Sequence, residues 1–495
     1  MRRRAMTGAA ITLLIALSIA AGMPAQEKPE QTGSAVRFKT LFTFDNSDGA
    51  APMGALVQGT DGNLYGTTAA GGLYNQGTVF KITPGGVLTT LYSFCAQTNC
   101  PDGNVPEAAL SLGTDGNFYG TTYSGGAHAD ACQAGCGVVF KITPAGAMTT
   151  LYSFCALPGC ADGAAPGALV QGNDGNFYGT TEQAGSNHCV NVNGCGTVFK
   201  ITSTGALTTL YQFTGQDGGG YYPSVFEQLV QGTDGNLYGT TPYGGSTNCF
   251  FGGCGTVFRI TPEGVLTTLY NFQGGVGQSV NPGGELIQAT DGNFYGTAGG
   301  GYYSPDCIEA CGTIFKMTPE GVGTTLVSLH SNQGDGPVGL VQATNGSFYV
   351  VTDAGGPSNS GTIFELTPEG VLTVLHTFNY LNAGSFPFSG VVQATNGSFY
   401  GDTENGGTIY SLSTGLGPFV ESVPPAGKIG TTAKILGTNL KFATGVAFNG
   451  VAASFTAESS TYIEATVPDG ATTGLIVVTL PTGALTSNVS FQVLP

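Results

Sequence analysis

The chain has 495 residues, of which 82 are glycine, 21 tyrosine, 29 phenylalanine and none tryptophan. Charged residues make up only 9% and the formal net charge is −17, which excludes a coiled coil and a basic surface for phosphate backbones or anionic lipids. Abundant glycine together with threonine, valine and aromatic residues is typical of β-strands joined by tight turns.

Residues 1–25 have the pattern of a secretory signal peptide. Arg2, Arg3 and Arg4 precede an apolar run from about Ala9, and small residues follow up to Ala25. The run is shorter than the roughly 20 residues needed to cross a bilayer, so we expect cleavage after Ala25 and no membrane insertion. Residues 26–35 are expected to form a linker. The sequence therefore predicts a soluble protein that is extracellular, at the cell surface or in the periplasm.

One segment, first seen at residues 56–68, recurs along the chain. Its tyrosine returns at intervals of 51 to 60 residues, at Tyr65, Tyr119, Tyr178, Tyr238, Tyr295, Tyr349 and Tyr400. Each copy contains Asp-Gly or Asn-Gly between two apolar runs, which is the strongest short signal for a β-hairpin. Two further strand-like runs follow, at residues 77–83 and 89–94 in the first copy. Seven such copies indicate the blades of a propeller.

The two ends of the repeat complement each other. The seventh copy stops after residues 407–412 and lacks its fourth strand, whereas residues 39–44 form an isolated fourth-strand sequence before the first copy. Pairing of these segments would close a ring. An open solenoid or a split ring is the alternative, but a solenoid needs polar caps at both ends and neither end shows one. We therefore predict an all-β fold with a seven-bladed β-propeller, closed by the N-terminal strand, over residues 36–417.

The repeat resembles a known family. Gln-Gly-Thr-Asp-Gly-Asn-Leu-Tyr-Gly-Thr-Thr, followed by Gly-Gly and Gly-Thr-Val-Phe-Lys-Ile-Thr-Pro, is similar to the GloVer tandem repeat of secreted bacterial proteins over about residues 36–415. The resemblance implies a secreted or surface-exposed protein without a defined activity.

Residues 418–495 depart from the repeat. Their segments 422–427, 437–439, 448–450 and 467–470 resemble an IPT/TIG domain, which is a small immunoglobulin-like β-sandwich. The length of this region and its short alternating strands agree with that fold. The resemblance implies a spacer or an interaction module.

Twelve cysteines form six close pairs. In an exported protein this pattern predicts disulfides within the pairs, although bridges between loops, such as Cys95 with Cys132, stay open. The pairs are Cys95/Cys100, Cys132/Cys136, Cys155/Cys160, Cys189/Cys195, Cys249/Cys254 and Cys307/Cys311. A zinc site needs two couples that meet, and here each couple occupies its own loop, so no metal site is expected despite the nearby His128 and His188.

Propeller topology places all these pairs on one face. The connections from second to third strand and from fourth to first strand lie on the same side, and we call that side the stapled face. The Asp-Gly and Asn-Gly turns between the first and second strands lie on the opposite side, which we call the turn face. Binding residues concentrate on loops that a rigid scaffold holds, so the stapled face is the candidate functional face. The alternative is that the bridges only rigidify long loops.

Two sets of residues on the stapled face are candidates for ligand binding. Acids before glycine in the fourth-to-first connections either line the channel mouth, for Ca²⁺ or sugar hydroxyls, or cap their own turns: Asp48, Asp102, Asp162, Asp217 and Asp335. Aromatic residues that break the repeat are expected to stack on sugar rings: Tyr221, Tyr222, Phe250, Phe251, Tyr302 and Tyr303. Apart from this Ca²⁺, no cofactor is expected.

Catalytic motifs are lacking. The sequence has no Gly-x-Ser-x-Gly elbow, His-Glu-x-x-His or phosphate loop, and its four histidines lie in different copies. Two arginines after the signal peptide are too few for a sialidase-like site, and the absence of tryptophan argues against a quinoprotein propeller. We therefore expect a monomeric, non-enzymatic binding or scaffold protein for a glycan or surface protein, and no nucleic-acid partner. The alternative is a secreted polysaccharide-degrading enzyme, a glycoside hydrolase or lyase, with acids at the channel mouth.

Overall fold

The computed structural model describes residues 36–128, 131–132, 135–185, 194–219, 228–249, 253–274, 279–300, 311–380 and 384–495. These residues form an all-β structure, in which the helical turns are two short 3-10 segments, Pro158–Cys160 and Leu440–Phe442. No helix in the described ranges has the length and apolar character needed to cross a membrane.

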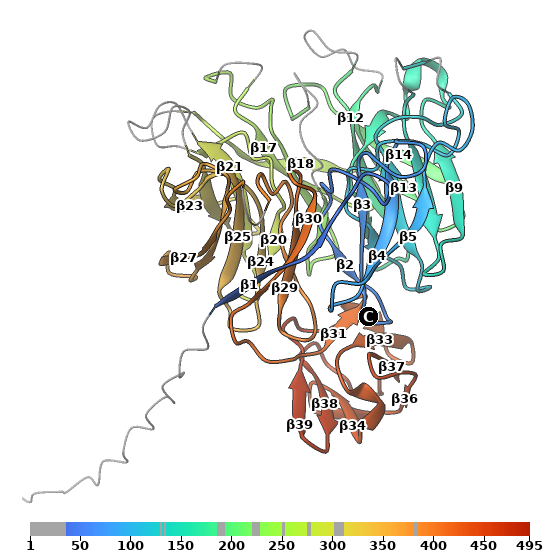
Figure 1. The fold of residues 1–495 in the computed structure, drawn as a ribbon, viewed down its shortest axis with the longest axis vertical. Coiled ribbons are helices and arrows are strands. Elements are labelled where there is room, and N and C mark those ends of the chain that lie inside the picture. The colour runs from blue at the N-terminus through green and yellow to red at the C-terminus, as the bar shows by residue number, and fades with distance from the viewer. Residues whose placement is uncertain are drawn as a thin grey trace, which may run out of the picture. The chain divides into compact units, whose positions relative to one another are not determined.

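Each of the seven repeats supplies one antiparallel sheet (Figure 1). In the first repeat the order is β2 (Val57–Gln58), β3 (Leu64–Thr68), β4 (Thr78–Ile82) and β5 (Leu88–Ser93), with each strand paired to the next. The Asp-Gly turn joins β2 to β3, and Gly62 adopts a φ of 77°, which glycine tolerates without a steric penalty. The sequence therefore folds each copy into a local meander.

The other repeats follow the same order, with an extra short strand in the third and fifth sheets. The strands of the second and third repeats are β6 (Ser111–Leu112), β7 (Phe118–Thr122), β8 (Val138–Ile142), β9 (Met148–Ser153), β10 (Ala164–Pro166), β11 (Val170–Gln171), β12 (Phe177–Gln183), β13 (Thr197–Ile201) and β14 (Leu207–Gln212). Those of the fourth and fifth are β15 (Val230–Gln231), β16 (Leu237–Thr241), β17 (Thr256–Ile260), β18 (Leu266–Asn271), β19 (Ser279–Val280), β20 (Ile287–Gln288), β21 (Phe294–Gly300), β22 (Thr313–Met317) and β23 (Gly323–Ser328). The sixth has β24 (Asp335–Gln342), β25 (Phe348–Ala354), β26 (Thr362–Leu366) and β27 (Leu372–Thr377).

The seventh sheet contains a strand from the start of the chain. It consists of β28 (Val392–Gln393), β29 (Phe399–Thr403), β30 (Thr408–Ser413) and β1 (Arg37–Thr43), and β1 runs antiparallel to β30. The Phe44 N–H also donates to the Gly407 carbonyl at 2.8 Å. The expected pairing of the N-terminal strand with the last repeat is therefore present.

Successive sheets pack through aromatic rings. The Tyr65 ring stacks on Phe118 of the next repeat with centroids 4.0 Å apart, and Tyr119 stacks on Phe177 at 3.9 Å. The same pairing recurs through Tyr349 and Phe399 at 4.0 Å. The repeated tyrosine and phenylalanine residues thus form the core between neighbouring sheets, as their apolar surface dictates.

A glutamine in the first strand links six of the seven sheets to the preceding one, and the second repeat has Leu112 at this position. Gln231 Oε1 accepts a hydrogen bond from the Asn173 backbone N–H at 2.8 Å. The same contact joins the last repeat to the first, because the Thr395 N–H donates to Gln58 Oε1 at 2.9 Å. The succession of sheets therefore returns to its start.

The C-terminal region has two antiparallel four-stranded sheets and one parallel strand pair. The first sheet comprises β31 (Glu421–Val423), β33 (Thr432–Leu436), β37 (Tyr462–Thr466) and β36 (Phe455–Ala457). The second sheet comprises β35 (Val451–Ala453), β34 (Gly445–Phe448), β38 (Ile476–Leu480) and β39 (Gly483–Thr486). The parallel pair consists of β32 (Ala426–Lys428) and β40 (Gln492–Leu494). Ile435, Ile463 and Ile476 lie in their common apolar core.

Candidate functional site

The carboxylates of the turn face are saturated by local hydrogen bonds. Asp174 Oδ1 accepts from the Asn176 N–H at 3.1 Å, and its Oδ2 accepts from Asn176 Nδ2 and from the Tyr178 hydroxyl at 2.8 Å. Asp115 has the same partners in its own repeat. Burial raises its pKa, but hydrogen bonds from Lys141, Asn117 and Tyr119 outweigh burial and bring the pKa down to about 2. These acids hold their turns together.

The C-terminal sheets contact the same face. The Thr461 hydroxyl donates to the Thr60 carbonyl at 2.8 Å, and the Gln492 side chain donates to the Thr233 carbonyl. Leu436 joins the core that contains Leu112 of the second repeat. A cavity of about 340 Å³ lies where residues of the first strands of three repeats meet the C-terminal region, and its lining includes Val57, Ser111, Val170, Glu421 and Ser487. The chain itself therefore occupies part of the turn face.

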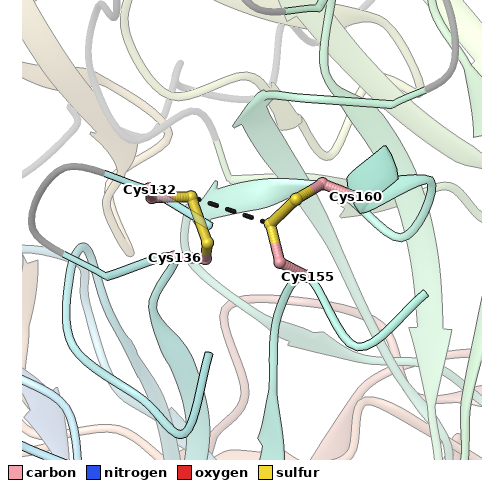
Figure 2. Close-up of side chains that lie close together, drawn as sticks. All are labelled: Cys132, Cys136, Cys155 and Cys160. Carbon is pink, nitrogen blue, oxygen red and sulfur yellow. Dashed lines mark hydrogen bonds between the residues drawn. A yellow bond between two sulfur atoms is a disulfide. The ribbon is translucent and has the colours of Figure 1, made fainter. Parts of the chain in front are cut away.

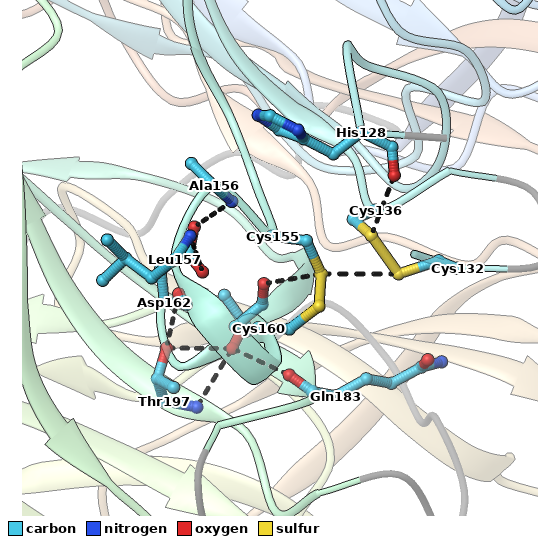
Figure 3. Close-up of a disulfide and its surroundings, with 12 residues drawn as sticks. His128, Cys132, Cys136, Cys155, Ala156, Leu157, Cys160, Asp162, Gln183 and Thr197 are labelled. Carbon is cyan, nitrogen blue, oxygen red and sulfur yellow. Dashed lines mark hydrogen bonds between the residues drawn. A yellow bond between two sulfur atoms is a disulfide. The ribbon is translucent and has the colours of Figure 1, made fainter. Parts of the chain in front are cut away.

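On the stapled face, most of the candidate acids serve their own connections. Asp102 Oδ2 accepts from the Tyr92 hydroxyl at 2.8 Å and from the Cys95 N–H at 3.0 Å. Asp162 accepts from the Tyr152 hydroxyl at 2.8 Å. It also accepts from the Ala156 N–H (Figure 3). Asp217 and Asp48 accept from N–H groups of their own connections, at 2.8 and 3.0 Å respectively. The structure thus gives these four acids the turn-capping geometry.

Asp335 is not equivalent to the other four acids. The carbonyls of Asp48 and Asp162 accept a hydrogen bond from a third-strand threonine, and Gln333 takes that place in the sixth repeat, at 2.6 Å from Thr362 Oγ1. Asp335 lies two residues further, at the start of β24. Burial and the charge of Asp335 raise the pKa of Asp353 to about 7. A ring of five matching carboxylates is therefore not formed.

The six aromatic candidates, Tyr221, Tyr222, Phe250, Phe251, Tyr302 and Tyr303, lie outside the described residues, as do His188, Cys189 and Cys307. Four local disulfides join cysteines that are both described, namely Cys95–Cys100, Cys132–Cys136, Cys155–Cys160 and Cys249–Cys254. Cys195 and Cys311 are also disulfide-bonded.

Two of these disulfides touch each other. Cys132 Sγ lies 3.6 Å from Cys155 Sγ (Figure 2). The sequence-based assumption that cysteine couples in separate connections stay apart is therefore wrong in the second repeat. The signal for this contact was present in the repeat itself, because only there do both connections of one repeat carry a couple.

A group of polar residues missed by the sequence analysis lies between the second and third repeats. Gln183 Nε2 donates to the Tyr123 hydroxyl at 2.9 Å. Burial, followed by the negative charges of Glu182 and Glu107, raises the pKa of Tyr123 to about 12, and burial alone raises that of Glu107 to about 7. Because Tyr123 directly follows β7 and Glu182 lies at the end of β12, these residues belong to the stapled face. Ionisable groups with such shifts are frequent in functional sites.

Glu285 marks the interior of the ring. A Cβ atom placed on Gly390 would lie 3.1 Å from Glu285 Oε2, although Gly390 belongs to the seventh repeat and Glu285 to the fifth. Repeats that are not neighbours approach each other only near the axis of a ring. Burial raises the pKa of the partly exposed Glu285 to about 7. A glutamate at this place stands out in the repeat, where five copies have alanine or glycine and the fourth has Gln228.

Asp402 is fully buried in β29, where the first repeats have threonine. The Ser389 hydroxyl donates to Asp402 Oδ1 at 3.2 Å, and burial raises the pKa of Asp402 to about 7. With no exposed surface, this carboxyl is part of the core and not of a binding surface.

A family model described as the Gloeobacter/Verrucomicrobia repeat matches residues 30–229, 128–308 and 192–416. No curated protein matches the chain.

Solved structures with some similarity include a fungal alcohol oxidase of the AA5 family in complex with copper, with 13% identity, a TM-score of 0.49, and coverage of 94% of this chain and 100% of that one. A protein of unknown function from Bacteroides thetaiotaomicron has 15% identity, a TM-score of 0.40, and coverage of 77% and 76%. A putative gluconolactonase has 12% identity, a TM-score of 0.38, and coverage of 78% and 94%.

Proposed function

Because the chain belongs to the Gloeobacter/Verrucomicrobia repeat family, we propose that it is a secreted binding protein whose stapled face holds a neutral glycan. In this proposal the seven sheets are the blades of a propeller, and the C-terminal sheets form an immunoglobulin-like spacer. Disulfides support export, since they persist in oxidising compartments. The protein acts as a monomer that presents its loops.

The main support is the contrast between the two faces. The turn face has saturated carboxylates and contacts the C-terminal sheets through Thr461 and Gln492. The stapled face has connections closed by disulfides, which reduce the entropy that a loop loses on binding. Tyr123, Gln183 and Glu107 add hydroxyl, amide and carboxyl groups there, which are the partners that sugar hydroxyls need.

The proposal assigns stacking to the six loop aromatics and leaves Ca²⁺ out, because the oxygens of Asp102 and Asp162 already organise their own connections. A polyanionic glycan is a poor ligand for this acidic chain, which has Arg37 and Arg259 as its only arginines after the signal peptide.

Binding to an array of neutral plant and bacterial polysaccharides tests the proposal. The double variant Tyr302→Ala/Tyr303→Ala is expected to weaken binding by about 10-fold or more, since stacking contributes about 1–3 kcal/mol per ring. Phe442→Ala is the control, because this ring is 64% exposed on the C-terminal region. Absence of glycan binding, or equal binding by both variants, would contradict the proposal. If the chain bound a surface protein and no glycan, the ligand would belong to the other class that the sequence predicts, a protein.

Glu107 favours a second candidate function, hydrolysis or lysis of a polysaccharide. A carboxyl with a pKa of about 7 holds a proton near neutral pH and is suited to act as a general acid. Turnover of a bound glycan that Glu107→Gln abolishes, with binding retained, would establish catalysis. Binding without turnover in the wild type would exclude this candidate.

A further inference from the structure

The disulfides of the second repeat bring four sulfur atoms together. Cys132–Cys136 lies in the connection between β7 and β8, and Cys155–Cys160 lies between β9 and β10. Cys132 Sγ and Cys155 Sγ are 3.6 Å apart, and all four Sγ atoms lie within 4.8 Å of one another. Figures 2 and 3 show the two bridges facing each other from separate connections.

These positions are close to those of a tetrahedral zinc centre. Zinc binds thiolate sulfur at about 2.3 Å, which places the sulfurs of a tetrahedral site about 3.8 Å apart. The distance between the two bridges is already in that range. Opening the bridges removes the covalent bond that holds the two sulfurs of each couple closer together than this. The spacings Cys-x3-Cys and Cys-x4-Cys match or approach those of structural zinc couples.

The surroundings favour a closed site over free thiolates. Cys136 is 1% and Cys155 8% exposed, and both belong to a core cluster with Phe154 and Leu169. An isolated thiolate would be costly in this environment, whereas a divalent cation compensates the charge of the sulfurs around it. Among the residues that the structure describes, this is the one cluster of His, Cys, Asp and Glu with metal-binding geometry.

We propose that Cys132, Cys136, Cys155 and Cys160 form a redox-dependent zinc site. In the oxidised chain they make two disulfides, and in the reduced chain they bind one Zn²⁺ as four thiolates. The proposal does not depend on glycan binding. The two states would stabilise the stapled face differently. Each disulfide closes its own connection, whereas the metal would join the two connections to each other.

The exchange between the states balances with a dithiol as reductant. Each disulfide accepts two electrons and two protons from one dithiol, which is oxidised to its own disulfide, and yields two cysteine thiols. Zn²⁺ then replaces the four thiol protons, which are released to solvent. Reoxidation by a disulfide oxidant returns the electrons to that oxidant and releases the metal.

The test uses the intact chain, reduced without oxygen by a dithiol, freed of the reductant and titrated with Zn²⁺ alone against a chromophoric chelator. We expect one more equivalent of tightly bound zinc in the wild type than in either C132S/C136S or C155S/C160S. Zinc in the wild type should also protect these four thiols, and no others, from alkylation as read by peptide mass spectrometry. Co²⁺ should give the intense visible bands of a tetrahedral tetrathiolate.

The matched controls are C95S/C100S and C249S/C254S, which remove disulfides with the same sequence separation as Cys155–Cys160. Both are expected to keep the full zinc content. Equal zinc content in reduced wild type and C132S/C136S would overturn the proposal, as would alkylation of the four cysteines in the presence of zinc. The alkylation pattern of the wild type decides the matter even if a variant does not fold.

Discussion

The connections between strands are stabilised in different ways on the two faces of the repeat region. On the turn face, an aspartate, an asparagine two residues later and a tyrosine four residues later satisfy one another, as Asp234, Asn236 and Tyr238 do. On the stapled face, the connections differ in length and are closed by disulfides, as at Cys95–Cys100. The difference teaches that side-chain hydrogen bonds within each turn fix the scaffold, which leaves the opposite connections free to vary.

The largest expected effect comes from opening the ring, on which both faces depend. Deletion of residues 1–44 removes β1 and exposes the core that contacts Leu41, Phe42 and Phe44. Phe44 is buried and Leu41 and Phe42 are partly buried, and the pairing with β30 is lost as well, so the loss should be about 5 kcal/mol and leave little folded protein. Deletion of residues 1–35 is the control and should leave thermal unfolding, followed by circular dichroism, unchanged. A cooperative transition at the wild-type temperature after the longer deletion would rule out closure by β1.

The next largest expected effect is on the pH dependence of stability, and it comes from Asp402. This residue lies in β29, which runs from the turn face to the stapled face. Its pKa is about 7 in the folded chain against 3.8 for a free side chain, so the folded state holds the proton more tightly. Stability from this group is complete below about pH 4 and is lost as pH rises to about 7, by up to about 4 kcal/mol. Ser389 and Tyr410 are its polar neighbours.

Asp402→Asn should therefore flatten the pH dependence of the free energy of unfolding, measured in urea between pH 4 and 8. Wild type and variant should converge near pH 4 and differ most near pH 7 to 8. An unchanged slope would show that Asp402 ionises normally in the folded chain.

Gln231→Leu tests the link between neighbouring turns. The variant leaves the Asn173 N–H without its 2.8 Å partner, and we expect the free energy of unfolding, measured in urea, to fall by about 1–2 kcal/mol.

The second repeat already has leucine at this position, where Leu112 packs with Leu436 of the C-terminal region. Leu112→Gln should therefore loosen that contact, seen as faster hydrogen exchange in β33. If Gln231→Leu were neutral, the hydrogen bonds from first-strand glutamines would not hold neighbouring sheets together. If Leu112→Gln were neutral, Leu112 would not contribute to the contact with the C-terminal region.

Much of this fold could be predicted from repetition alone. The tyrosine period and the unpaired strand at residues 39–44 predicted the sheets and the place of β1, because both are properties of sequence spacing. The pairing within couples such as Cys249–Cys254 also followed from spacing.

The candidate site was harder to predict, because it depends on which connections meet in space. Asp335 looked equivalent to Asp102 in its local Asp-Gly motif, yet it is displaced by two residues in the strand register. Glu107 and Tyr123 are far from Glu182 in sequence, and their shifted pKa values arise from burial that no local pattern encodes. The approach of Cys132 to Cys155 likewise required the fold.

The smallest expected effect lies in the sixth repeat, where the turn face has a neutral amide in place of the aspartate and a glutamate in place of the base. In the first five repeats an aspartate faces a base, such as Asp291 and Lys316 at 2.8 Å, but here the Asn345 amide donates to Glu365 at 3.0 Å. N345D/E365K restores the aspartate and base of the first five repeats and should be nearly neutral, while N345D alone places two carboxylates side by side. These groups are partly exposed, so the coupling energy in a double-mutant cycle should be about 0.3–1 kcal/mol and should shrink in high salt. Additive effects of the two substitutions would mean that the turn face tolerates any charge, and its uniformity would then come from the hydrogen bonds of the turn alone.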